Sequence, residues 1–209
     1  SDMMMPKVDG ITLCQRLKNN IQTSHIPFIL LTARTSDEVR MSVYSAGADS
    51  YLSKPVVYEV LLTRIEKLIE QQEMRRALFH TTIEVTPSSI TINSLDEALV
   101  QKALQSVEKN MDNPLYSVEE LGKDVGLSRG HLYRKLQSIT GQNPTDFIRS
   151  IRLKRAAQLL RDSQLNVTEI ADMVGFNTLK YFNKHFKETF GVTPTRYRGR
   201  DQENDQTPQ

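Results

Sequence analysis

The chain has 209 residues, a formal net charge of +2 at pH 7 and 38% hydrophobic residues, values that are ordinary for a globular protein of one large or two small domains. It has no apolar run of membrane-spanning length and no signal-peptide pattern at its start, so we expect a cytoplasmic segment without membrane contact. The single cysteine, Cys14, excludes an intrachain disulfide and predicts a buried thiol in a reducing compartment. The four histidines have no metal-ligand spacing with it, so no metal site is predicted.

The charges are distributed unevenly along the chain. Residues 1–95 hold 10 Lys+Arg and 10 Asp+Glu, residues 96–126 hold 3 and 7, and residues 201–209 hold 0 and 3. Residues 127–200 hold 14 Lys+Arg and 5 Asp+Glu, a net charge of +9. A concentrated basic block indicates nucleic-acid binding, and a merely solvated charged surface is the alternative.

Strand and helix patterns alternate over residues 1–72. The apolar run 26–31 predicts a buried strand, and residues 50–52 predict a second, short one. A capping-box pattern opens a predicted helix over 35–46, and apolar residues at helical spacing predict another over 56–71. Strands that alternate with helices favour an α/β domain with a parallel sheet.

A linker is predicted over residues 73–95, which are rich in Thr, Ser and β-branched residues and therefore expected to be extended. Ser94 then begins a capping-box pattern, so a helix is expected to start there. The apolar stripe of this helix consists of Val100, Leu104, Val107 and Met111. From here to residue 199 the pattern is helical, and the polar residues 200–209 predict a disordered tail.

Residues 117–149 and 166–198 repeat one pattern, in which Gly126 of the first copy matches Gly175 of the second. Each copy has a helix start, a short amphipathic helix, a glycine turn, and a second amphipathic helix that ends at another glycine. This is the helix-turn-helix pattern. A helix over 144–162, with a proline in its first turn, separates the two units.

The second helix of each unit is predicted to turn one face to the core and the other to a DNA groove. The core-facing residues are Leu132, Leu136 and Ile139 in the first unit and Phe182, Phe186 and Phe190 in the second. The outward residues are Gly130, Tyr133, Arg134 and Gln137, and Lys180, Asn183, Lys184 and Lys187. In a major groove Arg and Lys reach guanine, Asn bridges adenine, and Tyr meets a thymine methyl or a phosphate. Ser128 and either Asn177 or Thr178 are predicted N-caps, which leaves helix amides for a backbone phosphate.

The two outward faces are unequal. The second carries three lysines and an asparagine, which predicts stronger anchoring by charge, and the first discriminates with fewer contacts. Tyr181 and His185 are expected to pack on the flank of their helix. The basic residues expected on the surface of the connecting helix, where one could touch a phosphate, are Arg149, Arg152, Lys154 and Arg155.

Residues 96–198 resemble the AraC/XylS family of transcription regulators. The motifs that carry the resemblance are Leu-Tyr-Arg-Lys-Leu at 132–136 and the runs 151–160 and 174–194. The resemblance implies that both helices enter successive major grooves on one face of bent DNA, and its contact positions include Leu179. Gly130 departs from the family, which often has a larger residue there. The candidate DNA-binding residues are Ser128, Arg129, Tyr133, Arg134, Gln137, Thr178, Leu179, Lys180, Asn183, Lys184 and Lys187.

The front of the chain resembles a response-regulator receiver. The motifs are Asp2-Met-Met-Met-Pro6, Leu31-Thr-Ala-Arg34, Gly47-Ala-Asp49 and Tyr51-Leu-Ser-Lys54-Pro55. The resemblance assigns the phosphoacceptor to Asp2, the switch to Thr32 and its aromatic partner to Tyr51, and the phosphate-binding lysine to Lys54. In such a site a carboxylate accepts the phosphoryl group, a hydroxyl bonds it and a lysine neutralises its charge. The Lys54–Pro55 bond is a candidate cis peptide.

Compared with a complete flavodoxin-like receiver, the first two strands with their helices, most of the third strand, and the acidic pair that holds Mg²⁺ are absent. We therefore expect a fragment of a longer protein that has no cofactor itself and cannot be phosphorylated, whereas the complete receiver would use Mg²⁺. In receivers the surface that corresponds to residues 35–71 often dimerises, which predicts a homodimer.

The expected order is a partial receiver (1–72), a linker (73–95), an all-α AraC-type tandem helix-turn-helix domain (96–199) and a tail (200–209). It predicts a sequence-specific, promoter-binding transcription regulator of a two-component phosphorelay, and not an enzyme. A hybrid sensor with a histidine kinase in the same polypeptide, which can be membrane-anchored, is favoured over a free-standing response regulator. The alternatives are a phosphotransfer protein, which would need neither the basic block nor the doubled unit, and a dimerisation module.

Overall fold

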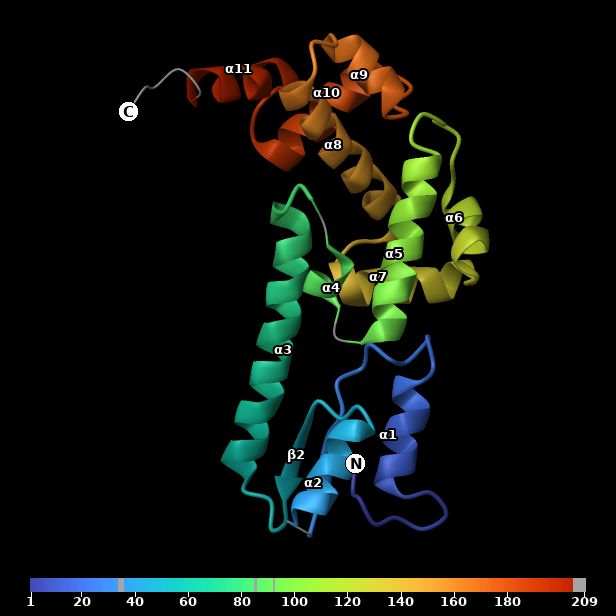
Figure 1. Cartoon of the computed structure of the whole chain (residues 1–209), viewed down its shortest axis with the longest axis vertical. Helices are drawn as coiled ribbons and strands as arrows, with labels where there is room; N and C mark the ends of the chain where they lie inside the picture. The colour runs from blue at the N-terminus through green and yellow to red at the C-terminus, as the bar shows by residue number, and fades with distance from the viewer. Residues whose placement is uncertain (34–35, 85, 92, 205–209) are drawn as a thin grey trace. The chain divides into compact units, whose positions relative to one another are not determined.

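The computed structural model describes residues 1–33, 36–84, 86–91 and 93–204 (Figure 1). Two compact units divide the chain. The first unit contains residues 1–79 and 87–98, and the second contains residues 80–86 and 99–209. None of the helices in the described ranges has the length and hydrophobicity of a membrane span.

The first unit is built on a parallel sheet, as the alternating pattern predicts. Strand β1 (Ile29–Thr32) pairs in parallel with β2 (Ser50–Ser53). On the other side of β1, a parallel bridge joins Asp2 to Leu31. Strand β1 begins three residues later than the apolar run suggests, because the amide of Phe28 donates to the Asp49 carboxylate at 2.6 Å instead of joining the ladder.

The helices of the first unit are α1 (Gly10–Lys18), α2 (Asp37–Ser45), most of α3 (Tyr58–Thr81) and α4 (Pro87–Ile90). Asp9 caps α1 by accepting from the Thr12 amide at 2.8 Å. The N-cap of α2 is Ser36; the expected capping-box residue Thr35 lies outside the described residues. The core of this unit contains the predicted buried thiol and consists of Cys14, Phe28, Leu30, Val43, Ala46 and Ala48.

An almost buried ion pair joins α1 to the sheet. Lys18 Nζ lies 2.6 Å from Asp49 Oδ2, and the two side chains are 8% and 15% exposed. The ammonium group also donates to the carbonyl of Ile26 at 2.9 Å. Both charges therefore have several partners, which a buried ion pair requires.

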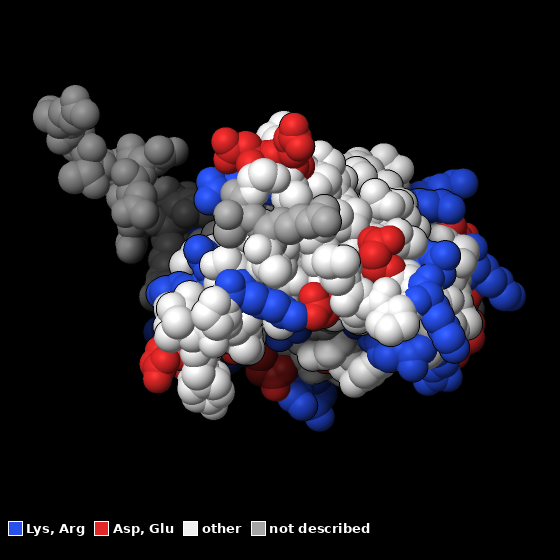
Figure 2. All heavy atoms as spheres, turned by 90° about the horizontal axis from the view of Figure 1, so that it is seen from below, with Lys and Arg blue, Asp and Glu red and all other residues white. Residues whose placement is uncertain are grey.

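Figure 2 looks onto the molecule from below and shows positively and negatively charged side chains among broad uncharged areas.

The expectation of an extended linker is wrong over much of its length. Helix α3 continues to Thr81 because the residues after position 70 are mostly strong helix formers, and residues 87–90 form α4. Helix α5 (Ser94–Lys109) begins at Ser94, but the capping side chain is Asn93, whose Oδ1 accepts from the Asp96 amide at 2.8 Å. The predicted stripe of α5 is buried at Val100, Leu104 and Val107.

The second unit contains helices in the order that the repeat predicts. After α5 come α6 (Val118–Val125), α7 (Arg129–Thr140), α8 (Pro144–Asp162), α9 (Val167–Met173), α10 (Leu179–Phe190) and α11 (Pro194–Asn204). Helix α8 has the predicted bounds. The predicted tail is wrong for residues 200–204, which belong to α11, and residues 205–209 lie outside the described residues.

The two helix-turn-helix units share their local signals. Ser117 and Asn166 are N-caps, and each forms a complete capping box. Gly126 and Gly175 follow the first helix of each unit in the left-handed conformation, with φ of +78° and +71°. At Gly175 a Cβ atom would also lie 2.5 Å from the Met111 carbonyl oxygen, so this turn requires glycine for space as well.

Helix α8 is a core element for both helix-turn-helix units. Its first half buries Phe147, Ile148 and Ile151, and α8 packs against α7. Its second half joins the core of the second helix-turn-helix unit. That core consists of Leu153, Ala156, Ala157, Leu160, Ile170, Ala171, Val174, Phe176, Phe182 and Phe186.

Two of the four basic residues expected on the surface of α8 are buried. Arg152 is 8% exposed and donates to the carbonyl oxygens of Gly175 at 2.9 Å and Asn113 at 2.5 Å. Lys154 is 6% exposed, and its ammonium group donates to the Thr82 carbonyl. The expectation was wrong because α8 has neighbours on most of its circumference.

Replacement of Lys154 by methionine should stabilise the second unit at neutral pH. Burial lowers the pKa of Lys154 to about 8. Because the unfolded chain keeps this lysine charged to about pH 10.4, burial of the charge costs up to about 3 kcal/mol below pH 8, and the cost disappears between pH 8 and about 10.4. Urea unfolding at pH 7 and pH 10 should therefore show a gain for Lys154→Met at pH 7 that shrinks at pH 10.

The matched control is Arg155→Met, at the exposed neighbouring position. It should change the free energy of unfolding by no more than about 0.5 kcal/mol at either pH. An equal gain for Lys154→Met at both pH values would contradict the explanation by burial of the charge.

Candidate nucleic-acid interface

Helix α7 presents the predicted outward face. Leu132 and Leu136 are fully buried, whereas Tyr133 is 51% exposed and Arg134 and Gln137 are exposed. The Gln137 amide donates to the Gly141 carbonyl at 3.0 Å, where the helix ends. Lys135 lies between these residues but is buried, so it adds nothing to the charge of this face.

The start of α7 differs in detail from the expected cap. Ser128 occupies the N-cap position, but its hydroxyl lies 2.8 Å from His131 Nδ1 and makes no cap hydrogen bond. The exposed guanidinium of Arg129 pairs with Glu119 at 2.8 Å. The backbone geometry of the predicted cap is therefore confirmed, and its side-chain hydrogen bond is not.

Helix α10 presents the second predicted face. The cap is Thr178, whose hydroxyl oxygen accepts from the Tyr181 amide at 3.2 Å; Asn177 was the alternative. Phe182 and Phe186 are fully buried. The opposite side of the helix carries exposed Lys180, Lys184 and Lys187; Leu179 in the first turn is also exposed, and Asn183 is half-buried. Lys184 lies 3.9 Å from Glu188, a loose pair between exposed groups that leaves the ammonium group accessible.

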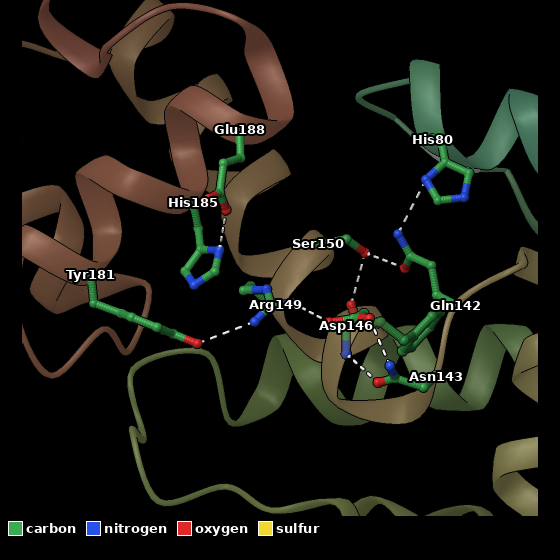
Figure 3. A network of polar contacts seen from close by, with 10 residues as sticks. His80, Gln142, Asn143, Asp146, Arg149, Ser150, Tyr181, His185 and Glu188 are labelled. Atoms are coloured by element: carbon green, nitrogen blue, oxygen red, sulfur yellow. Dashed lines mark hydrogen bonds and ion pairs between the residues drawn. The ribbon is translucent and has the colours of Figure 1, made fainter.

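A polar network joins the start of α8 to α10 (Figure 3). Asn143, the N-cap of α8, donates to the Asp146 carboxylate at 2.7 Å, and Asp146 forms an ion pair with Arg149. Arg149 Nη1 then donates to the hydroxyl oxygen of Tyr181 at 3.1 Å. No local sequence pattern indicates this contact, because its partners are 32 residues apart and lie on different helices.

The tyrosine is also fixed on its own helix. Its ring meets the ring of His185 edge-on, with the centroids 4.2 Å apart, which agrees with the expectation that both residues pack. His185 Nδ1 lies 2.8 Å from Glu188 Oε2. At the other end of the network, Gln142 accepts from the Ser150 hydroxyl at 2.9 Å.

A cavity of about 580 Å³ opens between the two helix-turn-helix units. The start of α6, one side of α8 and the turn before α10 line it. The basic and aromatic lining residues are Arg149, Arg152, Tyr116, Phe176 and Tyr181. The surface between the start of α6 and the start of α10 is therefore concave and carries arginine.

The first unit brings together two of the residues that the receiver resemblance assigns. Asp2 and Lys54 form an ion pair, and the hydrogen bond from Lys54 is the main cause of a lowered pKa of the Asp2 carboxyl. Thr32 ends β1 and is buried, with its hydroxyl 3.2 Å from the Met3 sulfur. Tyr51 meets Tyr44 edge-on at 5.8 Å. The Lys54–Pro55 peptide is cis, as predicted.

Each of the two units matches a known domain family. The model of the response regulator receiver domain matches residues 1–66, and that of a helix-turn-helix domain matches residues 121–200. The chain is 42% identical over 200 residues to "Histidine kinase P4" of Formosa agariphila, an alignment that covers 96% of this chain and 15% of that protein.

Two further relatives are informative. One is named a transcriptional regulator, and the other is aligned with this chain over most of its own length. The "DNA-binding dual master transcriptional regulator RpaA" of Synechocystis sp. is 29% identical over 154 residues, which cover 73% of this chain and 62% of that protein. The "Multiple antibiotic resistance protein MarA" of Salmonella typhimurium is 31% identical over 103 residues, 49% of this chain and 80% of that protein. The chain thus spans less than two thirds of the kinase and of RpaA. With its receiver-type front and its tandem helix-turn-helix units, it belongs to the response regulators that carry an AraC-type DNA-binding domain.

Proposed function

We propose that this chain regulates transcription by binding promoter DNA through α7 and α10, as the output part of a two-component phosphorelay. The observation that carries the proposal is the pair of exposed faces at matching positions of the repeat, one with Tyr133 and Arg134 and the other with Lys180 and Lys184. Both helices stand over buried cores that fix their orientation. The relative RpaA, which is named a DNA-binding transcriptional regulator, supports the same function.

The two helices have different tasks in this proposal. Arg134 and Lys184 can reach guanine acceptors, and half-buried Asn183 can bridge an adenine. Lys187, one helical turn beyond Asn183, is placed for a backbone phosphate. Because α10 has three exposed lysines and α7 has exposed Arg134 and the paired Arg129, α10 anchors by charge and α7 discriminates with fewer contacts.

Alanine substitutions on the two faces should separate base contacts from phosphate contacts. Arg134→Ala and Lys184→Ala should each weaken binding to a site selected from random DNA by about 1–3 kcal/mol and relax base preference at one position. Lys187→Ala should weaken binding to all sequences and reduce the salt slope by about 1. Fluorescence anisotropy over a range of salt concentrations measures both quantities.

Lys67→Ala is the control, because this exposed lysine of α3 pairs with Glu70 in the first unit. It should leave DNA binding unchanged. If no substitution on α7 or α10 alters binding, the assignment of the faces is wrong. Equal losses with identical salt slopes for Arg134→Ala and Lys184→Ala would contradict the division of tasks.

We further propose that the parent protein is a hybrid sensor whose complete receiver is phosphorylated with Mg²⁺. The match to a histidine kinase over 15% of its length supports this arrangement. The described residues contain no group of three or more His, Cys, Asp or Glu placed to hold a metal ion, and Asp2 is paired with Lys54, so they do not fit a Mg²⁺ site.

The chain by itself should therefore not accept a phosphoryl group. After incubation with acetyl phosphate and Mg²⁺, we expect no aspartyl phosphate at Asp2, as judged by phosphate-affinity electrophoresis and intact mass. Asp2→Asn provides the background. Label that is present in the wild type and absent from Asp2→Asn would show that the residues of this chain suffice.

Homodimerisation through residues 35–71 is the third element of the proposal. Leu62, Ile65 and Ile69 of α3 are 39%, 39% and 49% exposed and follow each other at the 3–4 spacing of a coiled-coil seam. We expect Ile69→Lys to shift the chain from dimer to monomer in sedimentation velocity. Met74→Lys, on another side of the same helix, is 62% exposed in the wild type and should leave the dimer intact. A monomeric wild type would refute the dimer.

A further inference from the structure

We propose that the hydrogen bond between Arg149 and Tyr181 fixes α10 relative to α7, and that the protein thereby discriminates operators by the number of base pairs between their two half-sites. Arg149 and Tyr181 are positioning residues in this inference, because they act through the exposed side chains of α10. The inference rests on the proposed DNA binding. It adds a determinant of specificity that lies outside both outward faces.

Direct polar ties cross between the helix-turn-helix units, and two of them start from arginines of α8. The buried tie is Arg152, which bonds the carbonyl oxygen of Asn113 before α6 and that of Gly175 in the turn before α10. The other tie runs from Arg149 to Tyr181 beside the cavity between the units. Arg152 belongs to the core, so its loss would disrupt folding. The Arg149–Tyr181 tie lies near the surface and can be removed without creating a cavity.

Each end of the surface tie is itself held in place. On α8, Arg149 pairs with Asp146, which accepts from the N-cap Asn143, so the guanidinium is anchored in the first turns of the helix. On α10, the ring of Tyr181 packs edge-on against His185. A donor fixed at one end and an acceptor fixed at the other restrict rotation of α10 about α8 (Figure 3).

Tyr181 lies in the first turn of α10, directly after Lys180 and three residues before Lys184. A rotation of the helix that breaks the tie therefore moves both lysines. One turn of B-DNA has 10–10.5 base pairs over about 34–36 Å, so one inserted base pair moves a half-site by about 3.4 Å and rotates it by about 35°. If α7 and α10 are held as one rigid body, they cannot adjust to the shifted and rotated half-site. If only α8 and Arg152 join them, they can adjust to part of the shift.

The experiment uses the full 209-residue chain and a site selected by it from random DNA. Dissociation constants are measured at one salt concentration for this site, for versions with one base pair inserted or deleted between the half-sites, and for versions with one base changed in each half-site. We expect the wild type to lose affinity at least about tenfold on insertion or deletion. Tyr181→Phe, which keeps the ring, and Arg149→Lys, which keeps the charge, should each reduce this spacing penalty by about tenfold.

The penalties for changed bases should stay as in the wild type, and so should the helical content of both variants. Arg155→Lys is the matched control at an exposed position of α8, where the arginine bonds Gln158, and it should keep the full spacing penalty.

Three results would overturn the inference. Unchanged spacing penalties in both variants would show that the tie does not set the spacing. Equal losses at every spacing with a shallower salt slope would show that Arg149 or Tyr181 contacts DNA directly. If the wild type selects no DNA at all, the proposed function fails together with the inference.

Discussion

The second unit depends on helix α8, which forms part of the core of two helix-turn-helix units at once. A helix in this position has little solvent-facing surface over its central turns, and beside exposed Arg155 the chain places two buried cations there, Arg152 and Lys154. The Arg152 guanidinium has carbonyl partners, its buried Nε has no hydrogen-bond partner among the described residues, and burial lowers the pKa of the group. Charged hydrogen bonds to carbonyls before α6 and before α10 offset the cost of removing the charge from water.

The packing around α8 makes position 175 require glycine for two reasons. Its positive φ ends α9 in the conformation that glycine adopts most readily, as at Gly126 in the first helix-turn-helix unit. In addition, the Met111 carbonyl lies where a side chain would be, and the Arg152 guanidinium is close by. At Gly126 no atom of a non-neighbouring residue in the described part of the chain lies within 4 Å of the same position. The two copies of the repeat are thus equivalent in local conformation and differ in tertiary contacts, since only the second turn is packed against a neighbouring loop.

In the first unit the order of motifs predicts the site because parallel strands bring their carboxyl ends to one edge of the sheet. Thr32 ends β1, Lys54 follows β2 and Asp2 forms a bridge beside β1, and the carboxylate and the ammonium group meet there. The basic side chains therefore have different surroundings in the two units. In the first unit one lysine lies beside a carboxylate, and in the second unit several lysines and arginines are exposed on two helices.

The sequence by itself determined the features that arise from local hydrogen bonds and helical period. It predicted the α/β character of the first unit, the two repeats with a helix start in each, the bounds of α8, and the outward position of Arg134 and Lys184. The tertiary structure decided what depends on contacts between elements: the burial of Arg152 and Lys154, the continuation of α3 to Thr81, and the bond between Arg149 and Tyr181. The periodicity of one helix shows which side faces its own core. It does not show whether a second unit covers the remaining sides, and in α8 that second contact removes two cations from the surface.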